Sequence, residues 1–405
     1  MAAAPAPEQL HEPGLLGRAA TASSVFSSPP AVRVLDTTLV HPSPPTSSGD
    51  PAPPEETSLP LTFFDVFWVP APPVQRVFFY RLLPDADIDA VLANLKDSLS
   101  HAVRAFLPLA GRLRLTPGTA NRLAADEPRE AARLAPLAPP LLHAGAVLAV
   151  QATPLSVRRG LALGVTVHHA ACDGAASTHF LHTWVAAACA GAGTTTPPPP
   201  AVIDRTLVSD PRGLYDVFCP PAASDALFVD RMPDDQRLAT FTLSRDHLQL
   251  VVGLDLDPNP NINSHVYLQR VKDAVAAAAA TRGVAPRPRC SSLVAALGFV
   301  WSCYRRAKPG GAGERACLLF FVDHRSRLKP PLPDKYFGNC VAGATAMAST
   351  CELAEAGADG GLLTACTAIA EAIEDAVSGP ATQTMGEKRR RFRELAATMD
   401  VLSVE

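Results

Sequence analysis

The residues with the most evident chemistry form one short motif, His169-Ala-Ala-Cys-Asp173-Gly174, in the first half of the chain. An imidazole, with an ordinary pKa of about 6.5, accepts a proton near neutral pH and is the usual general base. Asp173 follows His169 by four residues, and Gly174 is expected to permit a backbone turn that a side chain would hinder. The motif could therefore place a general base beside a carboxylate.

Other interpretations of this motif are open. A His-x-x-x-Asp pair arises often by chance, and spacing alone favours a hydrogen-bonded polar pair in a loop. A metal site would use His168, His169 and Asp173, but no further His or Cys cluster at ligand spacing accompanies them, so no metal is predicted. His168 is expected to be structural, because side chains alternate along a strand. Cys172 could be a nucleophile, but we expect a small buried hydrophobic residue instead.

An apolar run directly before the motif must position it. Residues 161–167 have the length and β-branched content of a buried strand, and the run ends abruptly at the polar motif. A helix is predicted over residues 88–106, where apolar side chains recur at helical spacing. The other predicted strands cover residues 32–39, 61–69, 76–83, 146–154, 238–243 and 316–322, and the other predicted helices cover 177–190, 291–305, 362–377 and 387–399.

Composition limits the class of protein. A length of 405 residues with 47% hydrophobic residues predicts a globular chain of roughly two or three domains. The net charge of -3 gives no reason to expect nucleic acid as a partner, and because no apolar run reaches membrane-spanning length, no membrane is expected either. The nine cysteines are scattered without a Cys-x-x-Cys motif, which indicates reduced thiols in a cytoplasmic protein.

Low-complexity segments suggest the domain boundaries. Residues 1–30 are rich in Ala, Ser and Pro and are predicted to be a disordered extension. A Gly/Thr stretch that runs into four prolines cannot form a regular helix or a central strand, so a crossover linker is placed at residues 191–235. The predicted domains are then residues 31–190 and residues 236–405.

A second stretch changes the balance between these interpretations. It contains Asp323-His-Arg325 and ends in Tyr336-Phe-Gly338-Asn339-Cys340. Together with the His169 motif, it closely resembles the plant BAHD acyl-CoA-dependent acyltransferases. The Tyr-Phe-Gly-Asn-Cys form is similar to the branch that includes anthocyanin and phenolic-glucoside malonyltransferases. Further matching stretches are Val32-Arg-Val-Leu-Asp36, Leu59-Pro-Leu-Thr-Phe-Phe-Asp65, Leu107-Pro-Leu-Ala-Gly-Arg-Leu113 and Cys290-Ser-Ser.

The resemblance implies an α/β fold in which two similar mixed-sheet domains, of the chloramphenicol-acetyltransferase-like type, have a channel between them. An acyl-CoA, with malonyl-CoA favoured, would enter from one face as the co-substrate. The partner that enters from the other face would be a small-molecule acyl acceptor, a phenolic or flavonoid glycoside. No permanently bound cofactor is expected, and a monomer is expected.

The resemblance also assigns roles to single residues. His169 would be the catalytic base that takes the proton from the acceptor hydroxyl. Asp173 would pair with Arg325 and, with Gly174, support the loop that presents His169, so we expect Asp173 and Arg325 at salt-bridge distance. The residues expected in the channel wall are Tyr336, Gly338 and Asn339.

The chain departs from the family pattern in three places. Residues 114–140 supply less material than the pattern has, and residues 251–267 look like an insertion into a helix that would otherwise run from His247 into Arg270. A final Asp-Phe-Gly-Trp-Gly motif is absent from the 405 residues, so the C-terminal domain is expected to be truncated. Two alternatives to malonyl transfer therefore stay open: a hydroxycinnamoyl or other acyl transferase acting on an alcohol or amine, and a catalytically defective relative.

Overall fold

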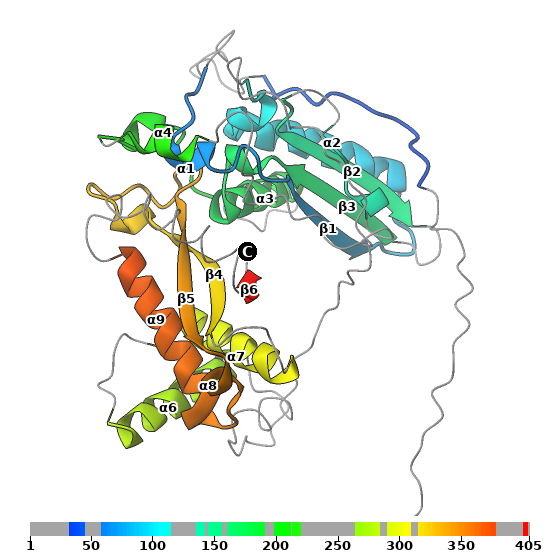
Figure 1. Cartoon of the computed structure of the whole chain (residues 1–405). Coiled ribbons are helices and arrows are strands. Elements are labelled where there is room, and N and C mark those ends of the chain that lie inside the picture. Colours follow the sequence, from blue (N-terminus) through cyan, green and yellow to red (C-terminus); the bar gives the residue numbers. More distant parts are fainter. Residues whose placement is uncertain are drawn as a thin grey trace, which may run out of the picture.

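Two three-stranded sheets, one from each half of the chain, organise the computed structural model of the protein (Figure 1). The structure describes residues 32–44, 58–114, 135–141, 145–155, 160–190, 198–211, 213–219, 264–283, 290–308, 315–377 and 400–403. Among these residues, no helix is both long and apolar enough to cross a lipid bilayer.

The first sheet has the strand order β1-β3-β2, and both pairs are antiparallel. Its strands are β1 (Val74–Arg81), β2 (Leu148–Leu155) and β3 (Gly160–Val167). All eight residues of β3 are buried, as a continuous apolar run predicts for a central strand. Gly164 lets the backbone near Leu137 pass close over β3, because an added Cβ would collide with the Leu137 carbonyl.

Two long helices pack with this sheet. In α2 (Ile88–Ala105), Asp87 caps the N-terminus, and α3 (Gly174–Ala188) begins after Asp173. Trp184 of α3 donates a hydrogen bond from Nε1 to Ser98 Oγ of α2 at 3.0 Å. One hydrophobic cluster joins both helices to the central strand, and it includes Leu99, Val103, Phe106, Val165, Phe180 and Trp184. The helices therefore cover the sheet that delivers His169.

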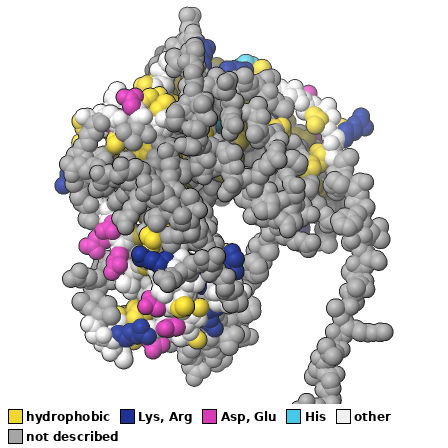
Figure 2. All heavy atoms as spheres, viewed as in Figure 1, with side chains coloured by type: hydrophobic (Ala, Val, Ile, Leu, Met, Phe, Trp, Pro, Cys, Tyr) yellow, Lys and Arg dark blue, Asp and Glu magenta, His cyan; other side chains and the backbone are white. Residues whose placement is uncertain are grey.

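The second sheet has the order β5-β4-β6, with one antiparallel and one parallel pair. Its strands are β4 (Arg315–Asp323), β5 (Val341–Ser349) and β6 (Asp400–Ser403). The helices of this half are α6 (Ser264–Thr281), α7 (Ser292–Ala307), α8 (Thr350–Ala354), η8 (Ala358–Leu362) and α9 (Leu363–Val377), and they share one hydrophobic core with the sheet. On the face shown in Figure 2, basic and acidic side chains are interspersed over this half.

Several short helices and turns complete the described fold. They are α1 (Phe63–Val66), η1 (Leu107–Ala110), η3 (Ala135–Leu137), η4 (His169–Ala171), η6 (Arg205–Leu207), α4 (Leu214–Phe218) and η7 (Arg325–Arg327). A third hydrophobic cluster takes members from both halves, among them Trp68, Ala170, Tyr336 and Cys340. The His169 motif thus lies where the two halves of the chain meet.

Most predicted elements are confirmed to within a few residues, and two predicted strands are wrong. Residues 32–39 have no regular structure, and most of their side chains are exposed. Residues 61–69 contain α1 instead of a strand, because Asp65 accepts hydrogen bonds from the backbone N–H and the hydroxyl of Thr62 at 2.9 and 2.7 Å. The predicted elements at 238–243 and 387–399 lie outside the described residues.

The described residues include parts of the predicted insertion and of the predicted linker. Helix α6 begins at Ser264, which lies inside the predicted insertion 251–267, and the rest of that insertion lies outside the described residues. The predicted linker 191–235 contains ordered structure, since η6 and α4 both fall within it. The predicted extension 1–30 is likewise outside the described residues.

Candidate active site

His169 opens the 3-10 turn η4, directly after the buried strand β3. The residue before it, His168, caps this turn, because its Nδ1 accepts a hydrogen bond from the Ala170 N–H at 3.2 Å. Burial, with a smaller contribution from neighbouring His169, lowers the pKa of His168 to about 4, so its Nδ1 stays a neutral acceptor. His168 therefore has a structural role, as predicted, because it caps the turn that carries His169.

The imidazole of His169 is half-buried and lies flat against the indole of Trp68. The two ring centroids are 3.6 Å apart and the ring planes are 7° from parallel. Burial is the main cause that lowers the pKa of His169 to about 4, and hydrogen bonding, including that with Asn339, acts in the opposite direction. At neutral pH the ring is thus uncharged, the protonation state in which it can accept a proton.

The Asp173 carboxylate and the Arg325 guanidinium are at salt-bridge distance, as predicted. Arg325 Nη2 is 2.9 Å from Asp173 Oδ2 and donates to Oδ1 at 3.0 Å, and both side chains are buried. Asp173 also accepts backbone hydrogen bonds from Ala176 at 3.0 Å and Cys340 at 2.9 Å. Burial alone would lower the pKa of Arg325, but the carboxylates of Asp173 and Asp323 raise it, so the guanidinium stays charged. Burial raises the pKa of Asp173, and the Arg325 guanidinium is the main cause that opposes this shift.

Asn339 connects the second half of the chain to the η4 turn. Its Nδ2 donates to the His169 carbonyl at 2.9 Å and to Asp65 Oδ1 at 3.0 Å. Its backbone N–H donates to the same Asp65 oxygen at 3.0 Å. Asn339 and Asp65 are both completely buried, so these bonds are shielded from water. The position of the His169 backbone therefore depends on residues from both halves.

Sequence reasoning missed two charged members of this site, Asp65 and Arg205. Arg205 Nη1 lies 3.6 Å from Asp65 Oδ2 and donates to the Tyr336 hydroxyl at 3.0 Å. Burial would lower the pKa of Arg205, but the Asp65 carboxylate is the main cause that raises it. Asp65 is the last residue of a stretch that carried the family resemblance, and this position was the one signal available for it. Arg205 lies in the segment that was predicted to be a linker.

Three residues expected in a channel wall are buried behind His169 instead of exposed. Tyr336 is 1% exposed and Asn339 has no exposed surface, and Gly338 is buried as well. An added Cβ at Gly338 would collide with the Arg205 guanidinium, so glycine is needed there for close approach. Burial raises the pKa of Tyr336 to about 12, so its hydroxyl stays protonated. In the structure Tyr336 and Gly338 contact the guanidinium groups, whereas Asn339 binds Asp65 and the His169 carbonyl.

Two expectations about the motif itself have different outcomes. The steric need for glycine at Gly174 is wrong, because Gly174 is the first residue of α3 and an added Cβ would meet no atom within 4 Å. Cys172 is buried, and burial, with the adjacent Asp173 carboxylate, raises the pKa of its thiol. A thiol held in this protonated form is a poor nucleophile, which agrees with the expected hydrophobic role.

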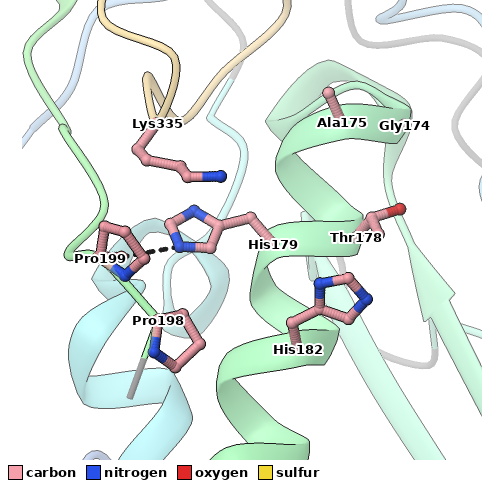
Figure 3. A pocket seen from close by; sticks show the side chains of 8 residues that line it. All are labelled: Gly174, Ala175, Thr178, His179, His182, Pro198, Pro199 and Lys335. Carbon is pink, nitrogen blue, oxygen red and sulfur yellow. Dashed lines mark hydrogen bonds between the residues drawn. The ribbon is translucent and has the colours of Figure 1, made fainter. Parts of the chain in front are cut away.

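One surface hollow of about 580 Å³ lies beside the motif but does not include His169 (Figure 3). Its lining residues are Gly174, Ala175, Thr178, His179, His182, Pro198, Pro199 and Lys335. His179 Nε2 shares a hydrogen bond of 2.8 Å with the Pro199 carbonyl, drawn as the dashed line in Figure 3. The hollow therefore lies between α3 and the segment that connects the two halves.

Comparisons with known proteins show a family match over most of the chain. The family model described as the Transferase family matches residues 31–126 and 123–379. A malonyl-CoA:anthocyanidin 5-O-glucoside-6''-O-malonyltransferase of Arabidopsis thaliana is 30% identical over 342 residues, which are 78% of this chain and 70% of that protein. Phenolic glucoside malonyltransferase 1 of the same plant is 29% identical over 417 residues, 92% of this chain and 84% of that protein.

A solved structure supports the same fold. The crystal structure of vinorine synthase superposes with a TM-score of 0.53 and 19% sequence identity, and the match covers 92% of this chain and 82% of that one. At this identity the likeness concerns the fold only. It agrees with the two mixed α/β halves that the sequence resemblance implied.

Proposed function

The chain belongs to the BAHD acyltransferases, and from this premise we propose that it moves an acyl group from coenzyme A to a hydroxyl of a phenolic or flavonoid glycoside. Malonyl is the favoured acyl group, because the relatives named above are malonyltransferases by name and because residues 336–340 of this chain resemble that branch of the family. The enzyme would work as a monomer in the cytoplasm, with acyl-CoA as a co-substrate and no resident cofactor.

The observation that carries the proposal is the neutral His169 imidazole at the junction of the two halves. Its Nδ1 is buried, so Nε2 is the nitrogen that we assign to the substrate side. The acceptor oxygen would attack the thioester carbonyl carbon while Nε2 takes the hydroxyl proton. The C–S bond then breaks, and the proton passes from Nε2 to the departing thiolate. The acyl group ends on the acceptor oxygen, and no covalent acyl-enzyme is needed.

The low pKa of His169 has two opposite consequences for the first of these proton transfers. A pKa of about 4 leaves the ring unprotonated near neutral pH, but it also makes the ring a weaker base than an ordinary imidazole. Proton acceptance becomes favourable as negative charge develops on the carbonyl oxygen during attack, because that charge stabilises the imidazolium. General base catalysis contributes about 10²–10⁴-fold, so substrate positioning and stabilisation of the oxyanion must supply the rest.

Asp173 and Arg325 have a supporting role in this mechanism. The carboxylate of Asp173 is bonded to Arg325 and to two backbone amides and faces none of the reacting groups that we assign. Arg325 Nη2 reaches both oxygens of Asp173, and such a charge-assisted contact restricts both side chains. We therefore propose that the pair fixes the end of η4 and the start of α3, so that His169 keeps one orientation.

The test is an incubation of the purified chain with a flavonoid glucoside, a phenolic glucoside and an amine acceptor, each with malonyl-CoA, acetyl-CoA and p-coumaroyl-CoA. Mass spectrometry identifies the products. We expect malonylated glucoside as the main product and a loss of about 10²–10⁴-fold in kcat for His169→Ala. Products from p-coumaroyl-CoA alone would favour the hydroxycinnamoyl alternative, and equal rates for wild type and His169→Ala would refute His169 as the base.

A further inference from the structure

Arg205 is buried although it lies in the segment that connects the two halves. It is the first residue of η6, and Asp204 caps this turn by accepting a hydrogen bond from the Thr206 N–H at 2.9 Å. The Arg205 side chain is only 5% exposed. Removing a guanidinium from water is costly unless its charge and its donors are matched. The partners of Arg205 therefore indicate what this burial achieves.

One guanidinium joins three segments that are far apart in sequence. Nη1 donates to the Tyr336 hydroxyl at 3.0 Å and lies 3.6 Å from the Asp65 carboxylate. Nη2 donates to the Ala171 carbonyl at 3.4 Å. Ala171 is the last residue of the η4 turn that His169 opens. Arg205 therefore contacts the catalytic turn directly and also reaches the second half of the chain.

Asp65 carries the influence of Arg205 to the other end of the same turn. Asp65 Oδ1 accepts a hydrogen bond from Asn339 Nδ2 at 3.0 Å, and Nδ2 also donates to the His169 carbonyl at 2.9 Å. An amide NH2 group has two protons, so both bonds can exist together. The η4 turn is thus bonded at its first residue through Asp65 and Asn339, and at its last residue by Arg205 itself.

The segment that carries Arg205 is fastened on both sides. The Val202 N–H donates to the Lys335 carbonyl, and the Phe337 N–H donates to the Val202 carbonyl, both at 2.9 Å. On the other side, His179 of α3 is hydrogen-bonded to the Pro199 carbonyl (Figure 3). The guanidinium also fills the space left by the missing side chain at Gly338. Arg205 therefore has little freedom to leave its position.

We propose that Arg205 is a positioning residue for His169. Through Ala171, and through Asp65 and Asn339, it fixes the η4 turn in the orientation in which the His169 ring stacks on Trp68. The expected effect on turnover rests on the proposed acyl transfer, but the positioning of the ring is a property of the protein without substrate. The connecting segment is then part of the site, and not only a link between two domains.

The decisive variant is Arg205→Lys. A lysine keeps a positive charge near Asp65, but its single ammonium cannot reach the Tyr336 hydroxyl and the Ala171 carbonyl in the fork geometry of a guanidinium. We expect kcat to fall about tenfold to a hundredfold, because small misplacements of a catalytic group have effects of that size, with KM for acyl-CoA changed by no more than about twofold. A purely structural role would not separate kcat from KM in this way.

A second measurement does not depend on acyl transfer. Diethyl pyrocarbonate modifies exposed neutral imidazoles, and peptide mass spectrometry can report the rate at His169 alone. We expect this rate to rise at least severalfold in Arg205→Lys, since a loosened turn releases the ring from Trp68. If wild type transfers no acyl group, the proposed function fails, yet the modification rates still decide whether Arg205 positions His169.

Two further variants control for folding. Arg104→Lys is the matched control, because Arg104 Nη1 also donates to a distant backbone carbonyl, that of Ser43, at 3.0 Å. It should leave kcat and the His169 modification rate unchanged. If Arg205→Lys does not fold, the neutral pair Asp65→Asn with Arg205→Met removes both charges together and takes its place. A folded variant at Arg205 with wild-type kcat and a wild-type modification rate would overturn the proposal.

Discussion

The two buried ion pairs near His169 hold its turn in different ways. Asp173 and Arg325 are in direct contact at 2.9 Å, and Asp173 lies only four residues after His169. Asp65 and Arg205 are 3.6 Å apart and act mainly through Asn339, Tyr336 and the Ala171 carbonyl. The first pair fixes the chain after the turn, and the second fixes the turn itself. A short sequence motif can therefore contain one residue of the first pair, whereas both residues of the second pair come from segments far from the motif.

The largest effect in this comparison is expected from the direct pair. Asp173→Ala leaves the Arg325 charge buried without its main partner, and it also removes the acceptor for Ala176 and Cys340. We expect a loss of about 3–5 kcal/mol in the free energy of unfolding. Urea unfolding followed by circular dichroism measures it.

The matched control for that prediction removes both charges. Asp173→Ala combined with Arg325→Met should lose less than the sum of the two single changes, because no uncompensated charge stays buried. A loss below about 1 kcal/mol for Asp173→Ala alone would show that water reaches the pair and that its burial does not matter.

Acid should weaken a part of the η4 turn that neither ion pair contacts, the His168 cap. The folded-state pKa of His168 is about 4, against about 6.5 in an unfolded chain, so between these values the unfolded state binds more protons. The contribution of neutral His168 is therefore complete above pH 6.5 and is lost as the pH falls toward 4. The expected decrease is about 2–3 kcal/mol.

His168→Asn checks that assignment. The Asn oxygen can accept the Ala170 N–H in place of Nδ1 and does not titrate in this range. Urea unfolding at pH 7 and pH 4.5 should show a smaller difference in stability for this variant than for wild type. An equal difference in the two proteins would mean that groups other than His168 cause the acid sensitivity.

Gly338→Ala should disturb the second ion pair without changing any charge. The new Cβ would collide with the Arg205 guanidinium, which the Tyr336 hydroxyl and Asp65 hold in place. Overpacking of this kind costs about 1–3 kcal/mol, and thermal unfolding measures it. Adding Arg205→Lys should recover part of the loss, since a lysine leaves more room. No recovery would place the strain elsewhere, for example at Tyr336.

The smallest effect is expected at Gly174, beside the first ion pair. An added Cβ meets no atom within 4 Å, and the residue begins helix α3. Gly174→Ala should change the free energy of unfolding by less than about 1 kcal/mol, and the expected change is a gain in stability because alanine restricts the unfolded chain. A larger loss would mean that the backbone at this position needs the freedom of glycine after all.

Local patterns were sufficient to predict strand β3 and the position of the His169 motif after it. The apolar run of β3 ends at His168, and this change from apolar to polar residues can be read directly from the sequence. The contact between Asp173 and Arg325 came from the family resemblance and not from spacing, since 152 positions separate the two residues. Arg205 had neither kind of signal, because a segment rich in proline gives no hint of a buried charge.

Two fold errors have identifiable physical causes. Residues 61–69 have the aromatic and β-branched content of a strand, but the bonds between Thr62 and Asp65 favour a helical turn. Strand β5 was not predicted, because its sequence, Val-Ala-Gly-Ala-Thr-Ala-Met-Ala-Ser, is dominated by small residues with little strand preference. Pairing along the full length of β4 provides the stabilisation that its own residues lack.

The parallel stack of Trp68 on His169 limits the directions from which a hydroxyl group can reach the imidazole nitrogen. The lone pair on an imidazole nitrogen points outward in the plane of the ring, and the indole, lying 3.6 Å away, fixes that plane and covers one of its faces. A hydroxyl must therefore approach along the edge of the ring, within a narrow fan of angles. Under the proposed function, this would select one of the several hydroxyls of a sugar by its direction of approach as well as by its shape.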